Sequence, residues 1–168
     1  MSFLKISSLI TTLNKLYELL SQGSHRGYIV GGFIRDWLLG RQVNDVDIAV
    51  DGNALSIAGE VAKELGGKFV LLDEANGIAR VVIMEEEQQR GASQNLRREE
   101  WHLDFSSFRG DIKSDLARRD FTINAMATEL SQLNVIVRQV KMGENHSQIK
   151  LIDPFSGRKD LEKRIVRA

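Results

Sequence analysis

Two adjacent glycines, Gly31 and Gly32, stand between a short apolar segment at 27–30 and a segment with helical spacing at 33–39. Glycine at such a junction predicts a tight turn that takes the chain from a strand into a helix. The free amides and helix N-terminus of such a turn favour an anion, and Arg35 is placed to reach the same phosphates. The alternative is a turn that needs glycine for its backbone angles, beside an ordinary surface arginine.

Two carboxylates separated by one residue follow this turn. Asp45 and Asp47 alternate with the apolar residues of a predicted strand at 46–50. Because residues i and i+2 of a strand share a face, both carboxylates point to one place while the opposite face is buried. Paired carboxylates suit magnesium, and two such ions assist nucleotidyl transfer. The alternative is a solvated strand edge without a function.

The remaining sequence alternates between helical and strand patterns without an internal repeat. Helices are predicted at 7–22, 33–39, 53–65 and 157–166, and helical segments near 115–129. Strands are predicted at 27–30, 46–50, 68–72, 78–84, 101–108, 134–140 and 149–152, and a polar loop at 85–100. This alternation predicts a mixed α/β domain. The last helix reaches the C-terminus without a capping residue, so we expect the chain to be cut rather than complete.

A third acid, Asp104, lies within the β-prone stretch at 101–109. On a strand beside the first pair it can accept the proton of an attacking hydroxyl or help to hold a metal ion. It can equally be a salt-bridge partner, and only its setting favours the functional interpretation.

A cluster of charged and polar residues begins at Arg118 and Arg119. Arginine suits triphosphate oxygens, and the acid that follows, Asp120, suits ribose hydroxyls. Thr122 is predicted to cap the next helix, in which Asn124 is either a phosphate or sugar ligand or an amide on the helix surface. The alternative is a solvated charge cluster in which Asp120 pairs with an arginine.

Composition excludes several other kinds of site. The chain of 168 residues has no cysteine, which excludes disulfides and thiolate metal sites. Its 23 basic residues balance 23 acidic ones, unlike a protein that coats nucleic acid. The three histidines stand apart in the sequence, and no P-loop, dinucleotide-binding, HExxH or GxSxG motif occurs. Since the sequence has neither a signal-peptide pattern nor an apolar membrane span, we expect a cytoplasmic protein with no membrane partner.

Taken together, these motifs resemble the catalytic head domain of class II tRNA nucleotidyltransferases (CCA-adding enzymes) and of bacterial poly(A) polymerases. Residues 30–40 together with 45–47 look like the family's metal-binding motif. Residues 115–127 look like its ribose-recognising motif. Residues 153–161 look like the flexible motif that joins the head to the next domain. The resemblance covers residues 27–168. It implies an N-terminal helix at 1–26, a nucleotidyltransferase head at 27–152, and the start of a linker to a neck domain at 153–168.

The resemblance also implies a fold and a set of site residues. The fold is an α/β nucleotidyltransferase fold of the DNA polymerase beta type, a mixed sheet of about five core strands flanked by helices, with additional local strands. Asp45 and Asp47 match the acids that bind magnesium in a two-metal site, and Asp104 matches the acid that supports the acceptor's attack. The candidate nucleotide-binding residues are Gly31, Gly32, Arg35, Asp36, Arg119, Asp120 and Asn124.

The implied reaction is attack of an RNA 3′-hydroxyl on the α-phosphate of CTP or ATP with release of pyrophosphate, adding C, A or both to a tRNA 3′ end. The family's base-selecting Glu-Asp-x-x-Arg helix is absent before Ala168, and 110–114 is short where CCA-adding enzymes carry a longer loop. CCA-, CC- and A-adding and poly(A) activities therefore stay open, with RNA bound mainly by other domains. The alternatives are a stand-alone nucleotidyltransferase acting on a small molecule or protein, and a nucleotide-binding head without turnover.

Overall fold

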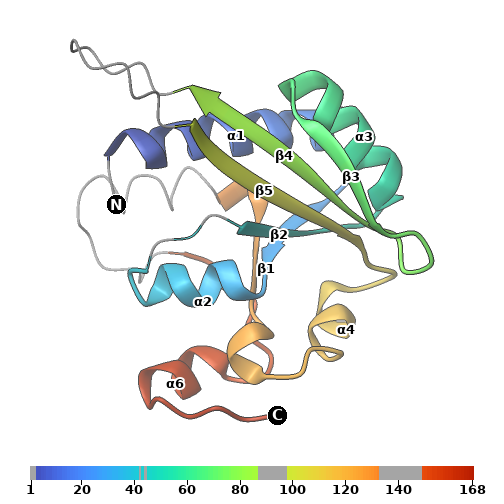
Figure 1. The fold of residues 1–168 in the computed structure, drawn as a ribbon. Helices are drawn as coiled ribbons and strands as arrows, with labels where there is room; N and C mark the ends of the chain where they lie inside the picture. The colour runs from blue at the N-terminus through green and yellow to red at the C-terminus, as the bar shows by residue number, and fades with distance from the viewer. Residues whose placement is uncertain (1–2, 42, 44, 87–97, 133–148) are drawn as a thin grey trace.

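The computed structural model describes residues 3–41, 43, 45–86, 98–132 and 149–168 of the chain. Figure 1 shows a twisted six-stranded sheet with helices packed around it, and the strands follow the order β3-β4-β5-β2-β1-β6. The strands are β1 Gly27–Val30, β2 Asp45–Val50, β3 Lys68–Asp73, β4 Ile78–Glu86, β5 Arg98–Ser107 and β6 Ala127–Glu129. The helices are α1 Phe3–Gln22, α2 Gly32–Leu38, α3 Ala54–Leu65, α4 Ile112–Leu116 and α6 Gly157–Glu162, with short 3-10 turns η1 Thr122–Asn124 and η2 Leu130–Gln132. The expected mixed α/β fold is confirmed.

The sheet is mixed because β2 and β5 run parallel while the neighbouring pairs are antiparallel. The parallel pairing sets Asp45 opposite His102 and Asp47 opposite Asp104. The antiparallel pairing of β4 with β5 then sets Arg80 opposite Asp104. Side chains directly opposite each other on paired strands lie on the same face. The sheet therefore gathers these charged residues from three strands onto one face.

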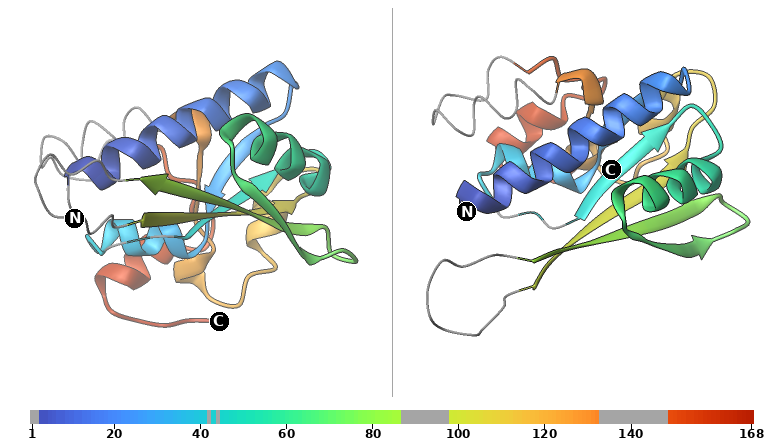
Figure 2. Two further views of the ribbon diagram at one scale, coloured as in Figure 1. Left: turned by 45° about the horizontal axis from the view of Figure 1, so that its top comes forward. Right: turned by 90° about the horizontal axis from the view of Figure 1, so that it is seen from above.

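Two apolar clusters fix the layers. The larger contains the β2 residues Val46, Ile48 and Val50 with residues of α1 and α3, and Figure 2 shows these two helices on the same face of the sheet. The smaller lies on the other face and joins Ala49 of β2 to α4 through Leu116. Alternation along β2 thus divides its apolar residues between two clusters.

Local signals account for several element boundaries. Asn53 accepts hydrogen bonds from the backbone amides of Leu55 and Ser56, which is the pattern of a helix N-cap and begins α3. Gly66 ends the same helix in the left-handed conformation, with φ 65°. The predicted helices at 7–22, 33–39 and 53–65 and the strands at 27–30, 46–50, 68–72 and 78–84 are confirmed to within a few residues.

The helical segments predicted near 115–129 are found only in part. This segment contains the end of α4, the single turn η1 and the strand β6, which pairs with β1 from Val30↔Ala127 to Tyr28↔Glu129. Pairing with an open strand edge outweighs local helical spacing here. The capping role predicted for Thr122 is also wrong, because its Oγ1 donates to Asp160 Oδ2 at 2.8 Å.

Other boundaries also differ from the sequence-based expectation. The predicted loop at 85–100 is shorter at both ends, because β4 and β5 stay paired as far as Glu86↔Arg98; its centre, 87–97, and the predicted strand at 134–140 lie outside the described residues. In place of a strand at 149–152 there is one bridge, Ala127↔Ile152. The last helix ends at Glu162 rather than 166. None of the described helices has the length and apolar character needed to cross a membrane.

The segment after Ile152 packs closely against η1. A Cβ built on Gly157 would lie 2.1 Å from the carbonyl oxygen of Thr122, so this position accepts glycine only. Asp160, 3% exposed, accepts hydrogen bonds from Thr122 and from Arg167 Nη2, the latter at 3.1 Å. The C-terminal segment therefore holds η1 in place.

An ion pair closes the open end of the β1–β2 ladder. The Arg26 backbone amide donates to Asp51 Oδ1 at 2.7 Å and Arg26 Nε donates to Asp51 Oδ2 at 2.8 Å. Burial raises the pKa of Asp51, but the hydrogen bonds and charge of Arg26 outweigh it and hold this pKa below 3.8. A carboxyl group with a lowered folded-state pKa stabilises the fold above its unfolded pKa and loses that effect as the pH falls through the folded value.

We therefore expect Asp51→Asn to be less stable than the wild type at pH 7, with the difference narrowing as the pH falls below about 4. Urea unfolding monitored by circular dichroism between pH 3 and pH 7 measures this difference. Glu64→Gln, at an exposed position of α3, is the control. A difference that stays constant over this pH range would contradict the assignment.

Candidate active site on β2 and β5

The three predicted acids come together on one face of the sheet. Asp45 and Asp47 are two residues apart on β2, and Asp104 stands directly opposite Asp47 on β5. Asp45 is 62% exposed and Asp104 is 19% exposed, while Asp47 is half-buried. The expected convergence of Asp45, Asp47 and Asp104 in space is thus observed.

Of the three acids, Asp47 lies where its ionised form is least favourable. Burial raises the pKa of Asp47, and the neighbouring charges of Asp104 and Asp45 raise it further. The charge of Arg119 and a hydrogen bond from the Gly32 amide act in the opposite direction. A half-buried carboxylate beside two others is stabilised by added positive charge, so this position is suited to a cation.

The glycine turn contacts this acid directly. Gly31 has φ 69°, and a Cβ on it would lie 2.7 Å from Arg119 Nη1 and 2.8 Å from Asp47 Oδ2. Glycine is therefore required both for the backbone angle and for the close approach of two charged side chains. The turn at Gly31 and Gly32 positions Asp47, with the Gly32 amide directed at a carboxylate of the chain itself.

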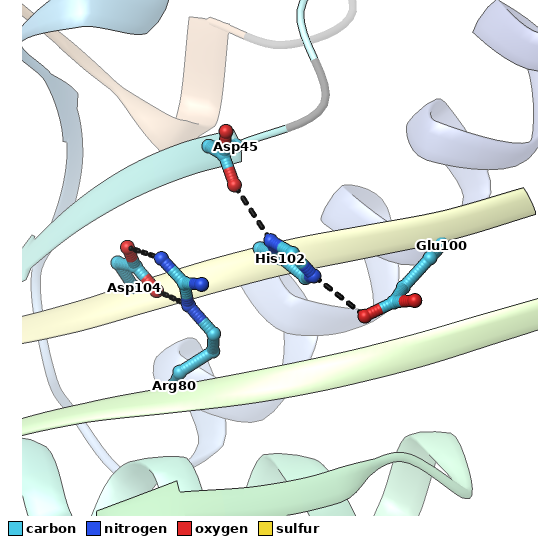
Figure 3. A network of polar contacts seen from close by, with 5 residues as sticks. All are labelled: Asp45, Arg80, Glu100, His102 and Asp104. Atoms are coloured by element: carbon cyan, nitrogen blue, oxygen red, sulfur yellow. Dashed lines mark hydrogen bonds and ion pairs between the residues drawn. The ribbon is translucent and has the colours of Figure 1, made fainter. Parts of the chain in front are cut away.

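Basic side chains pair with the other two acids (Figure 3). Arg80 donates from Nε and Nη2 to the two oxygens of Asp104 at 2.6 and 2.7 Å. His102 Nδ1 lies 2.7 Å from Asp45 Oδ1, and its Nε2 lies 2.7 Å from Glu100 Oε1. The bond to Glu100, and then that to Asp45, raise the pKa of His102 against the opposing effect of burial.

Sequence reasoning did not find Arg80, and it treated His102 as an isolated histidine. For His102 a signal was present, because Glu100, His102 and Asp104 alternate along one strand and must share a face. For Arg80 the sequence offered none, because its place opposite Asp104 depends on the pairing of β4 with β5.

A pocket of about 350 Å³ adjoins the acids. Its lining includes Asp47, Asp104, Asp115, Arg118 and Arg119. Asp115, 6% exposed, forms ion pairs with both arginines, and its contact with Arg119 Nη2 measures 3.5 Å. The Arg119 Nε is buried and has no hydrogen-bond partner within the described parts of the chain. The pocket is therefore lined by two guanidinium groups, whose charge Asp115 balances only in part.

The remaining candidates form a second group beside the first. Arg35 donates from Nη1 to Asn124 Oδ1 at 2.7 Å and from Nε and Nη2 to the carboxylate of Asp36 at 3.1 and 2.6 Å. The charge of Asp47 also acts on Arg35, which places the two groups near each other. The structure thus brings Arg35, Asp36 and Asn124 together, whereas Asp120 is exposed and is not part of the pocket lining.

The donor set suits a hard divalent cation, which prefers carboxylate oxygens. Asp45 and Asp47 supply them, and the raised pKa of Asp47 indicates that positive charge would be favourable there. Among the described residues, however, no group of three or more acidic or histidine side chains already surrounds one point. Asp104 is held by Arg80 instead.

Because Gly31 lies so close to Asp47 and Arg119, we expect Gly31→Ala to lower the stability of the fold more than alanine at a glycine with open space around it. Alanine at Gly40, which has φ 65° and open space around its Cβ position, costs about 1–2 kcal/mol for the backbone angle alone. Gly31, with φ 69° and ψ -138°, lies outside the left-handed helical region in a conformation nearly restricted to glycine, which costs about 1–3 kcal/mol, and its Cβ would also displace the ends of the Arg119 and Asp47 side chains. Thermal unfolding of the two variants should show the larger loss for Gly31→Ala, and equal losses would contradict the geometry.

Comparisons with known proteins identify the family of this chain. The family described as Poly A polymerase head domain matches residues 27–167. A CC-adding tRNA nucleotidyltransferase of Geobacter sulfurreducens is 38% identical over 90% of this chain and 29% of its own length. An A-adding tRNA nucleotidyltransferase of Aquifex aeolicus is 36% identical over 84% of this chain and 16% of its own length.

Solved structures give the same result. A CCA-adding enzyme in complex with ATP matches 96% of this chain and 34% of its own with a TM-score of 0.69 and 32% identity. The Thermotoga maritima CCA-adding enzyme in complex with tRNA matches 96% of this chain and 32% of its own with a TM-score of 0.68 and 33% identity. The chain spans about a third or less of each of these proteins. The resemblance read from the motifs is confirmed, and the chain belongs to the poly(A) polymerase head-domain family.

Proposed function

We propose that this chain is the catalytic head of a template-independent RNA nucleotidyltransferase that adds C, A or both from CTP and ATP to the 3′ end of tRNA. The observation that carries the proposal is the placement of Asp47 opposite Asp104 beside a pocket lined by Arg118 and Arg119. Relatives named as CC-adding, A-adding and CCA-adding enzymes support it. Poly(A) addition is the second candidate, favoured by the name of the matching family.

We further propose a layout and a location for the protein. Residues 27–152 form the head and 153–168 begin the linker to a neck domain, while the N-terminal segment, 1–26, contributes helix α1, which covers the sheet. The burial of Leu13, Leu16 and Leu20 in the same cluster as the sheet residues supports this covering role. RNA is bound mainly by parts of the protein other than this head, in the cytoplasm.

In this proposal the three acids have different roles. Asp45 and Asp47 hold magnesium, which when bound supplies Lewis-acid stabilisation of charge on the phosphoryl oxygens. Asp104 accepts the proton of the attacking 3′-hydroxyl. A carboxylate offers about four lone-pair positions, so the two hydrogen bonds from Arg80 leave Asp104 able to accept another.

The basic and amide groups bind and orient the nucleotide. Arg118 and Arg119, which line the pocket, receive triphosphate oxygens. Arg35 is held by Asp36 and Asn124 and adds positive charge on the other side of Asp47. The exposed carboxylate of Asp120 accepts hydrogen bonds from the ribose hydroxyls. Positioning and charge stabilisation of this kind account for most of phosphoryl-transfer catalysis.

The central test is calorimetric titration of the chain with CTP and with ATP, each with and without magnesium. We expect magnesium-dependent binding in the wild type and its loss in Asp45→Ala/Asp47→Ala, because the variant lacks both proposed cation ligands. Glu60→Ala, at an exposed position of α3, is the matched control and should bind normally. Magnesium-dependent binding that survives in the double variant would overturn the metal assignment.

Each single variant, Asp45→Ala and Asp47→Ala, should also abolish nucleotide transfer while leaving the fold intact. Transfer by the whole protein is measured with radiolabelled CTP or ATP and two acceptors, a tRNA that lacks its 3′ CCA and a tRNA that lacks only the terminal A. Circular dichroism of the same samples verifies folding. Transfer at wild-type rates by either folded variant would contradict the proposed two-metal chemistry.

The pocket lining also predicts weak discrimination between bases. Its charged residues, Asp47, Asp104, Asp115, Arg118 and Arg119, suit phosphates and hydroxyls rather than the edges of a base. We expect the chain to bind CTP, ATP, GTP and UTP with affinities within about tenfold, or 1.4 kcal/mol. Competition against a fluorescent nucleotide measures this range. A larger preference would show that the head itself reads the base.

A further inference from the structure

Arg80 stands in one row with two of the proposed catalytic acids. It lies opposite Asp104 in the β4–β5 pairing, and Asp104 lies opposite Asp47 in the β5–β2 pairing. The neighbours of Arg80 in β4, Ala79 and Val81, are buried in the core cluster of the other face. Alternation along the strand therefore directs Arg80 to the face of the acids, as Figure 3 shows.

The contact between Arg80 and Asp104 is bidentate. Both oxygens of the carboxylate receive a hydrogen bond, at 2.6 and 2.7 Å, from Nε and Nη2 of a single guanidinium. The two side chains are only 29% and 19% exposed. Paired bonds of this kind fix the orientation of a carboxylate as well as stabilising it. Asp104 is therefore held in one orientation before any ligand arrives.

The charge of Arg80 also extends beyond this pair. Asp104 has the largest effect on the pKa of Arg80 and raises it, and the more distant Asp45 and Asp47 raise it too, against the effect of burial. Because the interaction between two charges acts on both of them, the Arg80 guanidinium makes the electrostatic potential at all three carboxylates less negative. A divalent cation that binds Asp45 and Asp47 therefore meets a positive charge already in place.

We propose that Arg80 is a positioning residue that fixes the Asp104 carboxylate and, as a built-in counter-charge, weakens divalent-cation binding at the site. The inference rests on the proposed function, since that function assigns the cation to Asp45 and Asp47. It differs from a purely structural ion pair in what it predicts. A pair that only supports the sheet would change stability on mutation but would leave cation affinity unchanged.

Two substitutions separate orientation from charge. Arg80→Gln removes the charge and retains a hydrogen-bonding group, whereas Arg80→Lys retains the charge but cannot form the bidentate contact with Asp104. Arg109→Met removes an exposed arginine that follows β5 and is the control. Free Mn²⁺ measured by electron paramagnetic resonance reports cation affinity in the absence of nucleotide, and steady-state kinetics of the whole protein report transfer.

We expect Arg80→Gln to bind Mn²⁺ at least about fivefold more tightly than the wild type, and Arg80→Lys to remain within about twofold. Both variants should lose at least about tenfold in kcat with KM for the nucleotide changed less than about threefold, because Asp104 is no longer oriented. Combining Arg80→Gln with Asp104→Asn should remove the gain in Mn²⁺ affinity. Arg109→Met should behave as the wild type in both measurements.

The outcomes distinguish the inference from the function on which it rests. Wild-type protein that binds no Mn²⁺, or binds it equally after Asp45→Ala/Asp47→Ala, overturns both. Wild-type binding that depends on the two acids but stays within about twofold in folded Arg80→Gln overturns the inference alone. If Arg80→Gln does not fold, Arg80→Lys decides, since a kcat within about twofold of wild type contradicts the positioning role.

Discussion

The parallel pairing of β2 with β5 is the interaction on which the site depends. It sets Asp47 opposite Asp104 and Asp45 opposite His102. The register is held from the opposite face, where Val46, Ile48 and Val50 are buried in the large apolar cluster. A slip of one residue would turn these apolar side chains toward the site and the carboxylates toward the core. Apolar packing on one face of β2 therefore fixes the positions of the carboxylates on its other face.

This arrangement places carboxylates closer together than their charges favour, and the fold compensates with cations drawn from separate elements. Arg80 of β4 neutralises Asp104, His102 of β5 contacts Asp45, and Arg119, which follows α4, acts on Asp47. Compensation remains incomplete at Asp47, whose pKa is raised mainly by burial. The least compensated acid is thus Asp47, at the end of the row formed with Asp104 and Arg80 and next to the pocket, where an arriving cation gains most.

How much the sequence could predict depended on whether a feature is local. Strand alternation placed Asp45 and Asp47 on one face, and the glycine turn beside them was predicted to within a residue. Arg80 could not be found in this way, because its role comes from strand order, which local patterns do not specify. The strand at the end of the 115–129 segment was missed for a related reason, because β6 forms by pairing with the edge of β1.

The proposed nucleotide-binding group also depends on tertiary contacts with a distant part of the chain. Asn124, which holds Arg35 at 2.7 Å, lies in the single turn η1. One 3-10 turn has little stability of its own, and η1 is fixed by the bond from Thr122 to Asp160 and by the close packing of Gly157. The orientation of Arg35 therefore depends on the packing of α6, so that the segment proposed to lead out of the head also supports its nucleotide-binding side chains.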